Sequence, residues 1–385
     1  MIDHDLAERV TSIGRHNGLA AVGIASARPF DRALRIMLER RDAGLHGGMR
    51  FTYSDPHRST DPVRSLPLAR SVVVGALHYL RQDPGLTRPH GTSPQGGEDT
   101  RGNSARVARY SWSDHYETIT TALGHIAEEL VASGWSAVVR VDDNALVDKE
   151  AAVQAGLGWY GKNTLVLLPG AGSYFVLGSV ITDAPLPFST VPVNDGCGRC
   201  TRCMSACPTG ALVAPGVLDA RKCLAWLLEA PGQFPREHRS ALGDRIYGCD
   251  DCQEACPINR VATRHRPGPL IEASDEPTVS LTGLLALCDD ELLKRYGRWY
   301  IPKRQARFVR RNALVALGNV GNGLDPEVVH SLRGALASTD PIVRSHAVWA
   351  CARLGLHGLL GAGLEGETDP HVLEELALAG AGTTP

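Results

Sequence analysis

The sequence has neither an excess of charge of one sign nor a long apolar run. Its 385 residues carry 40 Lys plus Arg against 42 Asp plus Glu, so the overall basic field of a bulk nucleic-acid binder is missing. Any contact with nucleic acid is therefore expected to be local. The first twenty residues mix charged and apolar side chains and match neither a secretory leader nor an 18-residue membrane span. We therefore expect a cytoplasmic protein with no membrane partner.

Two common cofactor fingerprints are also missing. Glycines occur at 44–48 and 156–161, but neither group has the spacing of a Rossmann turn or a P-loop behind a strand. Cysteine, by contrast, is abundant: the chain has 10, and eight of them lie between Cys197 and Cys256. In a compartment that keeps thiols reduced, such a group indicates metal ligation rather than disulfides.

The eight clustered cysteines follow the spacing of a bacterial ferredoxin. One complete run, Cys197-x2-Cys200-x2-Cys203-x3-Cys207-Pro208, is followed by Cys249-x2-Cys252-x3-Cys256-Pro257, which repeats its second half. In such modules the fourth cysteine of each run ligates the other cluster, and we expect it to begin a helix. Cys223 replaces the missing first ligand of the second run, where Ile246 stands. The spacing thus predicts two [4Fe–4S] clusters, one on Cys197, Cys200, Cys203 and Cys256, the other on Cys207, Cys223, Cys249 and Cys252.

A zinc site is the alternative for these cysteines, but zinc takes four ligands and rarely has this spacing. The two remaining cysteines, Cys288 and Cys351, stand in apolar stretches with helical periodicity. We expect both to be buried core thiols, because free cysteine behaves as a small apolar residue.

The chain is expected to be multidomain, of α/β plus α+β class, with boundaries near residues 190 and 270. Residues 1–190 alternate helical and strand patterns, which indicates an α/β domain. Prolines bracket the cysteine module at 191–270. The Gly-, Pro- and polar-rich segment 81–103 is predicted to be a long loop. Strands are predicted at 21–25, 71–77, 137–141, 164–168 and 174–181, and helices around 6–13, 116–133 and 151–154.

Residues 271–385 have a helical and repetitive pattern. The stretch Ala313–Gly321 (ALVALGNVG) recurs 34 residues later as Ala347–Gly355 (AVWACARLG). This is similar to HEAT-type repeats, in which each helical pair buries its apolar stripe only against its neighbours. Two amphipathic helices that are similar by chance are the alternative.

One carboxylate stands where a predicted strand ends. Asp142 follows the strand at 137–141, and the glycine-rich stretch 155–164 (AGLGWYGKNT) comes shortly after it. A carboxylate in such a place is a candidate proton donor. A helix N-cap is an equally good reading, because Asp is preferred at that position.

A basic run lies just before the repeats. From Lys294 to Arg311 there are eight basic residues and no acidic one, with Tyr296, Trp299 and Tyr300 interleaved. We predict that Arg304, Arg307 and Arg311 share one helical face that tracks a phosphate backbone, while the aromatic rings stack on unpaired bases. A solvated charged face is the alternative. The candidate nucleic-acid contacts are Arg298, Lys303, Arg304, Arg307, Arg310 and Arg311.

The AGLGWYGKNTLVL stretch, the segment Gly172-Ser173-Tyr174-Phe175, the eight cysteines and the C-terminal repeats together resemble the epoxyqueuosine reductase family over most of the chain. The resemblance implies a nitroreductase-like domain (1–190) that holds cobalamin, a two-cluster domain (191–270) that supplies its electrons, and HEAT-like repeats (271–385) that bind tRNA. It implies reduction of epoxyqueuosine at the tRNA wobble position to queuosine. It also implies a low-potential donor of the ferredoxin or flavodoxin type. No apolar seam demands a dimer, so we expect a monomer.

Matched motif by motif, the resemblance implies that Asp142 is the proton donor. Two departures from the family pattern are present. Asp143-Asn144 follows Asp142 where the family has Thr or Ser and then Gly, and His115-Tyr116-Glu117 stands where Asp-Tyr-His is common. The first departure places a second carboxylate near the expected pocket. The cobalamin contacts that the resemblance implies are Arg58, Asp142, Val166, Leu177 and Asp250.

Two other functions compete with this one. A corrinoid reductase of small molecules, similar to reductive dehalogenases, usually carries a twin-arginine export signal, which the first residues here do not show. The second alternative is a non-catalytic electron-transfer ferredoxin with an attached scaffold. This alternative gives no function to the first 190 residues or to Asp142. Retained corrin separates this carrier from both reductases, and salt-dependent tRNA binding separates the two reductases.

Overall fold

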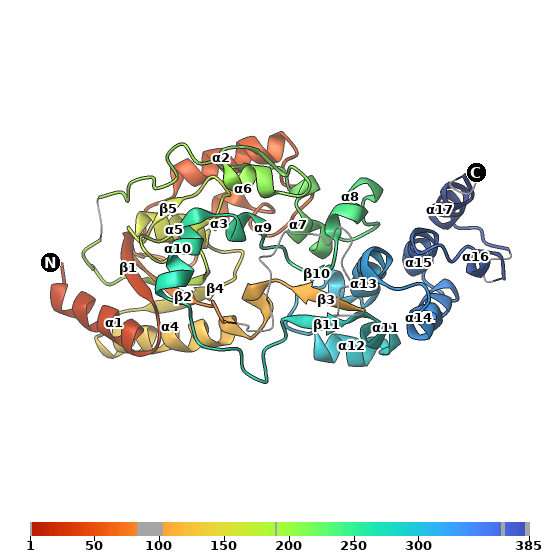
Figure 1. Ribbon diagram of the computed structural model, residues 1–385. Coiled ribbons are helices and arrows are strands. Elements are labelled where there is room, and N and C mark those ends of the chain that lie inside the picture. Colours follow the sequence, from red (N-terminus) through yellow and green to blue (C-terminus); the bar gives the residue numbers. More distant parts are fainter. Residues whose placement is uncertain (1, 83–102, 189–190, 363–365, 382–385) are drawn as a thin grey trace. The chain divides into compact units, whose positions relative to one another are not determined.

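The computed structural model describes residues 2–82, 103–188, 191–362 and 366–381 and divides into two compact units (Figure 1). Most of the loop predicted at 81–103 lies outside the described residues. The domain boundaries near 190 and 270 remain a prediction. The first unit is formed by Met1–His90, Ser113–Arg221 and Asp251–Glu272, and the second by Gly91–Trp112, Lys222–Asp250 and Ala273–Pro385.

A four-stranded sheet forms the centre of the first unit. Its strand order is β1-β2-β7-β4, and every neighbouring pair is antiparallel. The predicted mixture of helices and strands is present, but alternation along the sequence does not here produce parallel strands. All four strands match predicted ones, with small shifts at their ends: β1 (Ala21–Ser26), β2 (Ser71–His78), β4 (Ala137–Val141) and β7 (Phe175–Thr182).

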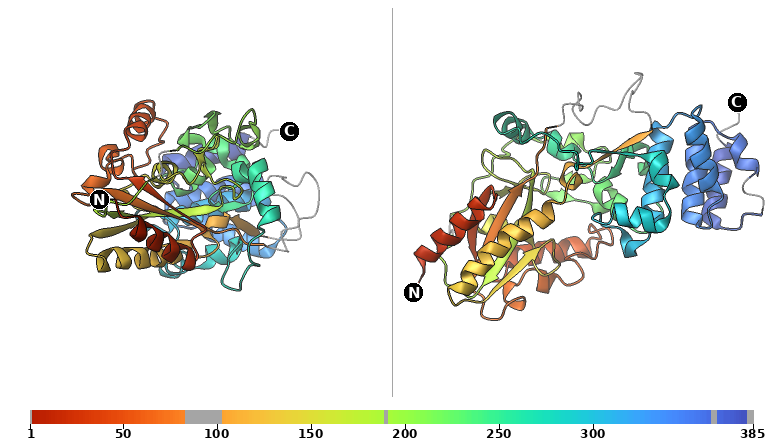
Figure 2. Two further views of the ribbon diagram at one scale, coloured as in Figure 1. Left: turned by 90° about the vertical axis from the view of Figure 1, so that its left-hand side faces the viewer. Right: turned by 90° about the horizontal axis from the view of Figure 1, so that it is seen from below.

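Helices cover both faces of this sheet. On one face α1 (His4–His16) and α4 (His115–Ala132) lie side by side, red and yellow in Figure 2, and bury Leu6, Val10 and Leu123. On the other face α5 (Asp148–Gln154) packs against β1, β2 and β7. Because both faces are covered, the middle strand β2 is buried along nearly its whole length, as its continuous apolar run predicts.

The remaining elements of the first unit are short. The strand predicted at 164–168 shrinks to β6 (Val166–Leu167), because Thr164 has a φ of 68° and forms a turn with Gly161. The other elements are α2 (Asp31–Asp42), α3 (Pro56–Ser59), the 3-10 helix η1 (Pro62–Arg64), β5 (Trp159–Tyr160), α6 (Arg202–Ala206), β8 (Leu212–Ala214), β9 (Val217–Leu218), α9 (Asp251–Glu254) and α10 (Pro257–His265). The 3-10 helix η3 (Ala220–Lys222) spans the boundary, because Arg221 is assigned to the first unit and Lys222 to the second.

The second unit combines a small sheet with a row of helices. Strand β3 (Ser104–Val107) pairs in parallel with β10 (Arg245–Tyr247) and antiparallel with β11 (Thr278–Ser280). The long helices α13 (Arg307–Val320), α15 (Pro341–Arg353) and α17 (Pro370–Ala381) pack in succession (Figure 1). The others are η2 (Arg109–Ser111), α7 (Leu224–Glu229), α8 (Arg236–Leu242), α11 (Leu281–Ala286), α12 (Asp289–Arg295), η4 (Pro302–Arg304), α14 (Pro326–Leu336) and α16 (Gly358–Ala362).

Candidate active site and cluster-binding segments

Asp142 lies immediately after β4, at the point where the chain leaves the sheet. Its φ of 48° is in the left-handed region, which residues other than glycine rarely adopt. The following helix, α5, begins only at Asp148, and Val147 is its N-cap. The N-cap alternative for Asp142 is therefore wrong. Asp142 as a residue is exposed, so the loop that carries it is open to solvent.

Three carboxyl groups gather around this loop. Burial by the surrounding loop raises the pKa of Asp142, even though the residue as a whole is exposed, and the charge of Asp143 raises it further. Burial raises the pKa of Asp148 well above its ordinary value, with the charges of Asp142 and Asp143 adding to the effect. The nearby guanidinium of Arg140 lies 3.6 Å from Asp143 Oδ2. The loop thus holds an accessible carboxyl group that keeps its proton to higher pH than an ordinary aspartate.

The loop is fastened to the helix that carries Arg58. The amide N–H of Thr52 donates to Asn144 Oδ1 at 3.3 Å, and the Ser59 hydroxyl donates to the Asn144 carbonyl oxygen at 2.6 Å. The amide of Val147 in turn donates to the Ser59 carbonyl oxygen at 2.9 Å. Arg58 itself is exposed, on α3. The structure therefore brings the segment of Arg58 and the loop of Asp142 together, although 84 residues separate them in sequence.

Val166 and Leu177 belong to one apolar cluster on the α5 side of the sheet. Val166 is buried, whereas Leu177, Tyr160 and Phe175 are only half-buried at its margin. Asp250, the remaining predicted cobalamin contact, belongs to the second unit. It is buried there, and its Oδ2 accepts the amide N–H of Arg109 at 2.7 Å.

Residues of the first predicted cluster converge within the first unit. Cys197 and Cys256 pack against the same apolar group, formed by Trp159 and Leu167 of the β5-β6 hairpin. Cys203, on α6, is buried, and its pKa is raised first by burial and then by the charges of Cys256 and Cys197. Three of the four thiols that the crossover rule assigns to one cluster are thus brought together, across more than 50 residues of sequence.

The second ligand set is divided between the units, with Cys207 and Cys252 in the first and Cys223 and Cys249 in the second, so its assignment remains a prediction. The expectation that the fourth cysteine of each run begins a helix holds for Cys256, the N-cap of α10. For Cys207 it is wrong, because that residue ends α6 and a turn leads from it to β8.

The two cysteines outside the module differ from one another. Cys351 is fully buried on α15, as predicted, and burial raises the pKa of its thiol to about 12. The prediction for Cys288 is wrong, since this residue is exposed as the N-cap of α12. The run Asp289-Asp290-Glu291 that follows it forms the polar first turn of that helix, and Glu291 accepts the Cys288 amide N–H.

A buried polar network that the sequence did not reveal joins the cluster helices to the sheet. Asn259 accepts the amide N–H of Ser173 at 2.8 Å and donates to the Ser173 hydroxyl at 2.9 Å. Gln253, next to Cys252, donates to the Ser173 carbonyl oxygen and to the Tyr79 hydroxyl, both at 3.1 Å. A Cβ on Gly172 would lie 2.3 Å from Asn259 Oδ1, which explains the glycine of this segment.

Asn259→Ala is expected to destabilise the folded protein by about 1–3 kcal/mol, because the buried amide N–H of Ser173 loses its acceptor. The measurement is the thermal unfolding midpoint of the reconstituted protein under anaerobic conditions. Asn194→Ala, at an exposed position of the same unit, is the matched control and leaves the midpoint unchanged. Equal midpoints for the two variants would contradict a structural role for the network.

The basic run at 294–311 does not form the continuous face that its spacing predicts. Arg304 lies in η4, ahead of α13, so it does not share a helix with Arg307. The prediction of Arg311 as a tRNA contact is wrong, because its side chain is fully buried. It donates to the carbonyl oxygens of Leu227, Leu228, Ala230 and Gly232, around the end of α7. Burial lowers the pKa of this guanidinium to about 9.

The other predicted contacts have mixed exposure. Arg298, Lys303 and Arg304 are exposed, whereas Arg307 and Arg310 are half-buried and pair with Asp340 and Asp289. Two of the three aromatic rings are unavailable to bases. Trp299 is buried and stacks on Tyr296 and Tyr247, with ring centroids 4.5 and 4.7 Å apart, and only Tyr300 is exposed.

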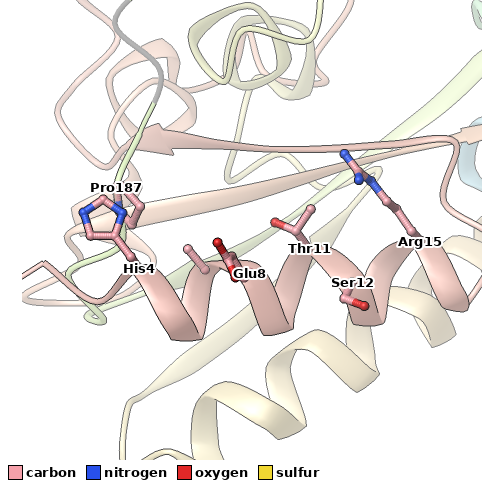
Figure 3. A pocket seen from close by; sticks show the side chains of 7 residues that line it. His4, Glu8, Thr11, Ser12, Arg15 and Pro187 are labelled. Carbon is pink, nitrogen blue, oxygen red and sulfur yellow. The ribbon is translucent and has the colours of Figure 1, made fainter.

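A pocket of about 370 Å³ lies alongside α1 (Figure 3). His4, Glu8, Thr11, Ser12 and Arg15 line it from the helix, and Pro187 closes one end. No residue predicted for catalysis, cobalamin or the clusters lines this pocket, and no charged side chain in it is buried. It is therefore not a candidate for the active site.

The chain is similar to known proteins over almost its full length. An epoxyqueuosine reductase of Bacillus cereus is 31% identical over 378 residues, covering 96% of each chain. The chain belongs to the epoxyqueuosine reductase family. Another member of this family, from Pseudomonas aeruginosa, is 34% identical over 91% of this chain and 95% of its own.

Residues 196–259 match a family described as a 4Fe-4S double cluster binding domain, which confirms the two-cluster module predicted from the cysteine spacing. Solved structures of epoxyqueuosine reductases superpose with a TM-score of 0.83 at 28% identity, covering 97% of this chain and 98% of theirs. One of them holds a tRNA-Tyr stem loop modified with epoxyqueuosine. In another, from Bacillus subtilis, the loop of a catalytic aspartate is swung out of the active site.

Several features of this epoxyqueuosine reductase fold have little or no signal in the sequence. No motif in the sequence marks Asp148, and Gln253 and Asn259 have no motif beyond their place beside the cysteines. The one sequence signal for the buried network was the Gly172-Ser173 pair, but the sequence does not indicate that Asn259 is its hydrogen-bond partner. Among the described residues, every helix is too short or too polar to cross a lipid bilayer.

Proposed function

We propose that this chain reduces epoxyqueuosine in tRNA to queuosine, with cobalamin as the reducing cofactor and two [4Fe–4S] clusters as its electron supply. The observation that carries the proposal is Asp142, an accessible carboxyl group with a raised pKa in the same unit as the converging Cys197, Cys203 and Cys256. Membership of the epoxyqueuosine reductase family over 96% of the chain favours this function over a small-molecule corrinoid reductase and over a simple electron carrier.

The residues of the first unit fit a large, flat, largely apolar cofactor. The half-buried Tyr160, Phe175 and Leu177 leave apolar surface at the margin of the α5-side cluster, next to the buried Val166. This partly exposed apolar margin is the surface that we assign to the cofactor. Arg58, on the helix fastened to the Asp142 loop, is available to a polar group at the edge of the cofactor. Asp250 remains a proposed cobalamin contact only because of the resemblance to the epoxyqueuosine reductase family.

The reaction consumes two electrons and two protons per epoxide and releases its oxygen as water. Cobalamin, when bound, supplies a low-valent cobalt centre that acts as nucleophile and reductant. The carboxyl group of Asp142 donates a proton as the epoxide oxygen leaves. Burial and then the charge of Asp143 raise the pKa of this carboxyl group, so it keeps its proton to a higher pH than an ordinary aspartate.

The helices of the second unit are the proposed tRNA-binding part, as HEAT-like repeats. The recurring stretches lie on α13 and α15, which pack against each other, and Asp340 caps α15 at the start of the second copy. Lys303 and Arg304 are the exposed cations for phosphate contacts, and Tyr300 is the exposed ring for a base. Arg298 is also exposed but pairs with Glu276 at 3.0 Å. Arg307 and Arg310 need to leave their carboxylate partners to take part.

The test is anaerobic reconstitution with iron, sulfide and cobalamin, followed by incubation with epoxyqueuosine-containing tRNA and a low-potential reductant. Mass spectrometry of the released nucleosides is expected to show the loss of one oxygen from epoxyqueuosine. Bound corrin with unaltered tRNA would contradict the proposal and point to another substrate. A protein reconstituted without cobalamin is the control and leaves the nucleoside unchanged.

A further inference from the structure

Exposed arginines lie next to the ligands of the first predicted cluster along the chain. Arg199 lies in the loop that carries Cys197 and Cys200, and Arg202 is the first residue of α6, which carries Cys203. Arg260 and Arg264 lie one turn apart on α10, the helix for which Cys256 is the N-cap. Arg266 follows that helix. We call these five side chains, all exposed, the arginine surface: Arg199, Arg202, Arg260, Arg264 and Arg266.

The charges of the arginine surface are not neutralised within the protein. Across the described residues, none of its five guanidinium groups lies within 4.0 Å of a carboxylate oxygen. Arg260 Nε donates to the carbonyl oxygen of Glu254 at 3.1 Å, which leaves its charge unpaired. Asp195 is the one carboxylate in residues 191–210 and 256–266, and it accepts the Cys197 amide N–H at 2.8 Å. These two segments thus carry five arginines against one aspartate, whereas the neighbouring α9 contributes Asp251 and Glu254.

One exposed apolar side chain lies among these charges and can form a contact with a partner protein. Val261, between Arg260 and Arg264 on α10, is 52% exposed. Transient electron-transfer complexes bury little surface, and charges around such an interface steer the partners together. Residues 191–210 and 256–266 contain no Phe, Trp or Tyr, so they offer no aromatic platform for the bases of an RNA. This composition favours a protein partner over RNA.

We propose that the arginine surface is the docking site of a small acidic one-electron carrier of the flavodoxin or ferredoxin class, and that the cluster on Cys197, Cys200, Cys203 and Cys256 is the point of electron entry. One electron leaves the reduced carrier and reduces the cluster, and no bond forms or breaks. Electron transfer weakens steeply with distance, and a carrier held by Arg199 and Arg260 lies next to cluster ligands. The proposal rests on the proposed function in one respect only, namely that the electrons delivered to the cluster are used to reduce the epoxide.

The test compares reconstituted wild-type protein with Arg260→Glu/Arg264→Glu, which leaves the cysteine loop untouched. Stopped-flow absorbance follows cluster reduction by reduced flavodoxin at low and high ionic strength, and titration with oxidised flavodoxin gives the Kd. The double variant is expected to lose about tenfold or more in rate and affinity at low ionic strength, because it replaces attraction by repulsion. The difference shrinks at high salt, where these charges are screened.

Two matched variants complete the experiment. Arg15→Glu/Arg28→Glu makes the same change of charge at two exposed positions of the same unit and is expected to behave as wild type. Arg260→Lys/Arg264→Lys keeps the charge and is expected to restore fast reduction. Reduction by dithionite and the iron content stay the same in all variants, which shows that loading is intact. None of these readouts needs tRNA or cobalamin, so they stand apart from epoxide reduction.

Two outcomes would overturn the proposal. Equal rates of reduction by flavodoxin for the wild type and Arg260→Glu/Arg264→Glu at low ionic strength would show that the carrier docks elsewhere. A double variant that keeps its flavodoxin kinetics but loses affinity for tRNA would assign the arginine surface to the nucleic acid instead.

Discussion

Asp142→Asn is expected to lower the rate of epoxyqueuosine reduction by about 10²- to 10⁴-fold, the usual contribution of a positioned proton donor. The amide is nearly isosteric with the acid, so it fits the left-handed position after β4, but it has no acidic proton to give. Cobalamin is expected to stay bound, as its visible spectrum after gel filtration will report. Loss of the cofactor together with an intact rate per bound corrin would assign Asp142 to binding rather than to proton transfer.

The pH dependence gives a second view of the same residue. Asp142 donates only in its protonated form, so the rate is expected to decline as pH rises through its pKa. Because burial and the charge of Asp143 raise that pKa, the decline comes at a higher pH than for an ordinary aspartate. Asp143→Asn removes the second cause, and the decline is expected to move to lower pH while the rate on the acidic side is kept. An unmoved pH profile in Asp143→Asn would contradict this coupling.

Loss of a cluster ligand is the change with the second largest expected effect. Cys203→Ser and Cys256→Ser are each expected to retain about half of the iron after anaerobic reconstitution and to abolish turnover, because each removes a ligand of one of the two clusters. Cys288→Ser is the control, at an exposed cysteine outside the module, and is expected to keep full iron and activity.

The double variant Cys203→Ser/Cys256→Ser tests the crossover assignment directly. The two thiols lie close enough for the charge of Cys256 to raise the pKa of Cys203, which supports a shared cluster. If they share it, the double variant holds as much iron as either single variant. If each run of cysteines instead formed its own cluster, the double variant would lose nearly all of its iron.

The iron in these variants is best measured by colorimetric assay beside electron paramagnetic resonance of the dithionite-reduced protein. Two interacting clusters give a more complex signal than one, so a single remaining cluster is expected to give a simpler spectrum. A wild-type spectrum in Cys256→Ser would show that this thiol is not a ligand.

Much of the architecture could be predicted because it depends on short-range patterns. The helix at α4 and the strands β1, β2, β4 and β7 follow from the period of their apolar residues. The cluster module follows from cysteine spacing, since a cubane held by a short loop constrains the sequence separation of its ligands. Asp142 was found because it stands directly after a strand, although its N-cap alternative could be dismissed only once α5 was seen to begin at Asp148.

The failures depended on contacts between distant segments. Arg311 matched a surface charge in the sequence, but its partners Leu227 and Leu228 are 84 and 83 residues away, and they bury it. Trp299 and Tyr296 match base-stacking rings in the sequence, but they stack on each other, and Tyr247, about 50 residues away, stacks on Trp299. Cys288 shows the opposite error, because three acidic residues after it place it at the exposed start of a helix.

The sequence by itself determined the two-cluster module, the main helices and strands of the sheet domain, and the family to which the chain belongs. Each of these depends on the type and spacing of residues that are close together in the sequence. The tertiary structure alone decided the antiparallel pairing, the raised pKa of Asp142, the network around Asn259 and the unneutralised arginine surface. The physical reason is that burial, desolvation and charge pairing arise only when segments such as Ser173 and Asn259, 86 residues apart, are brought into contact.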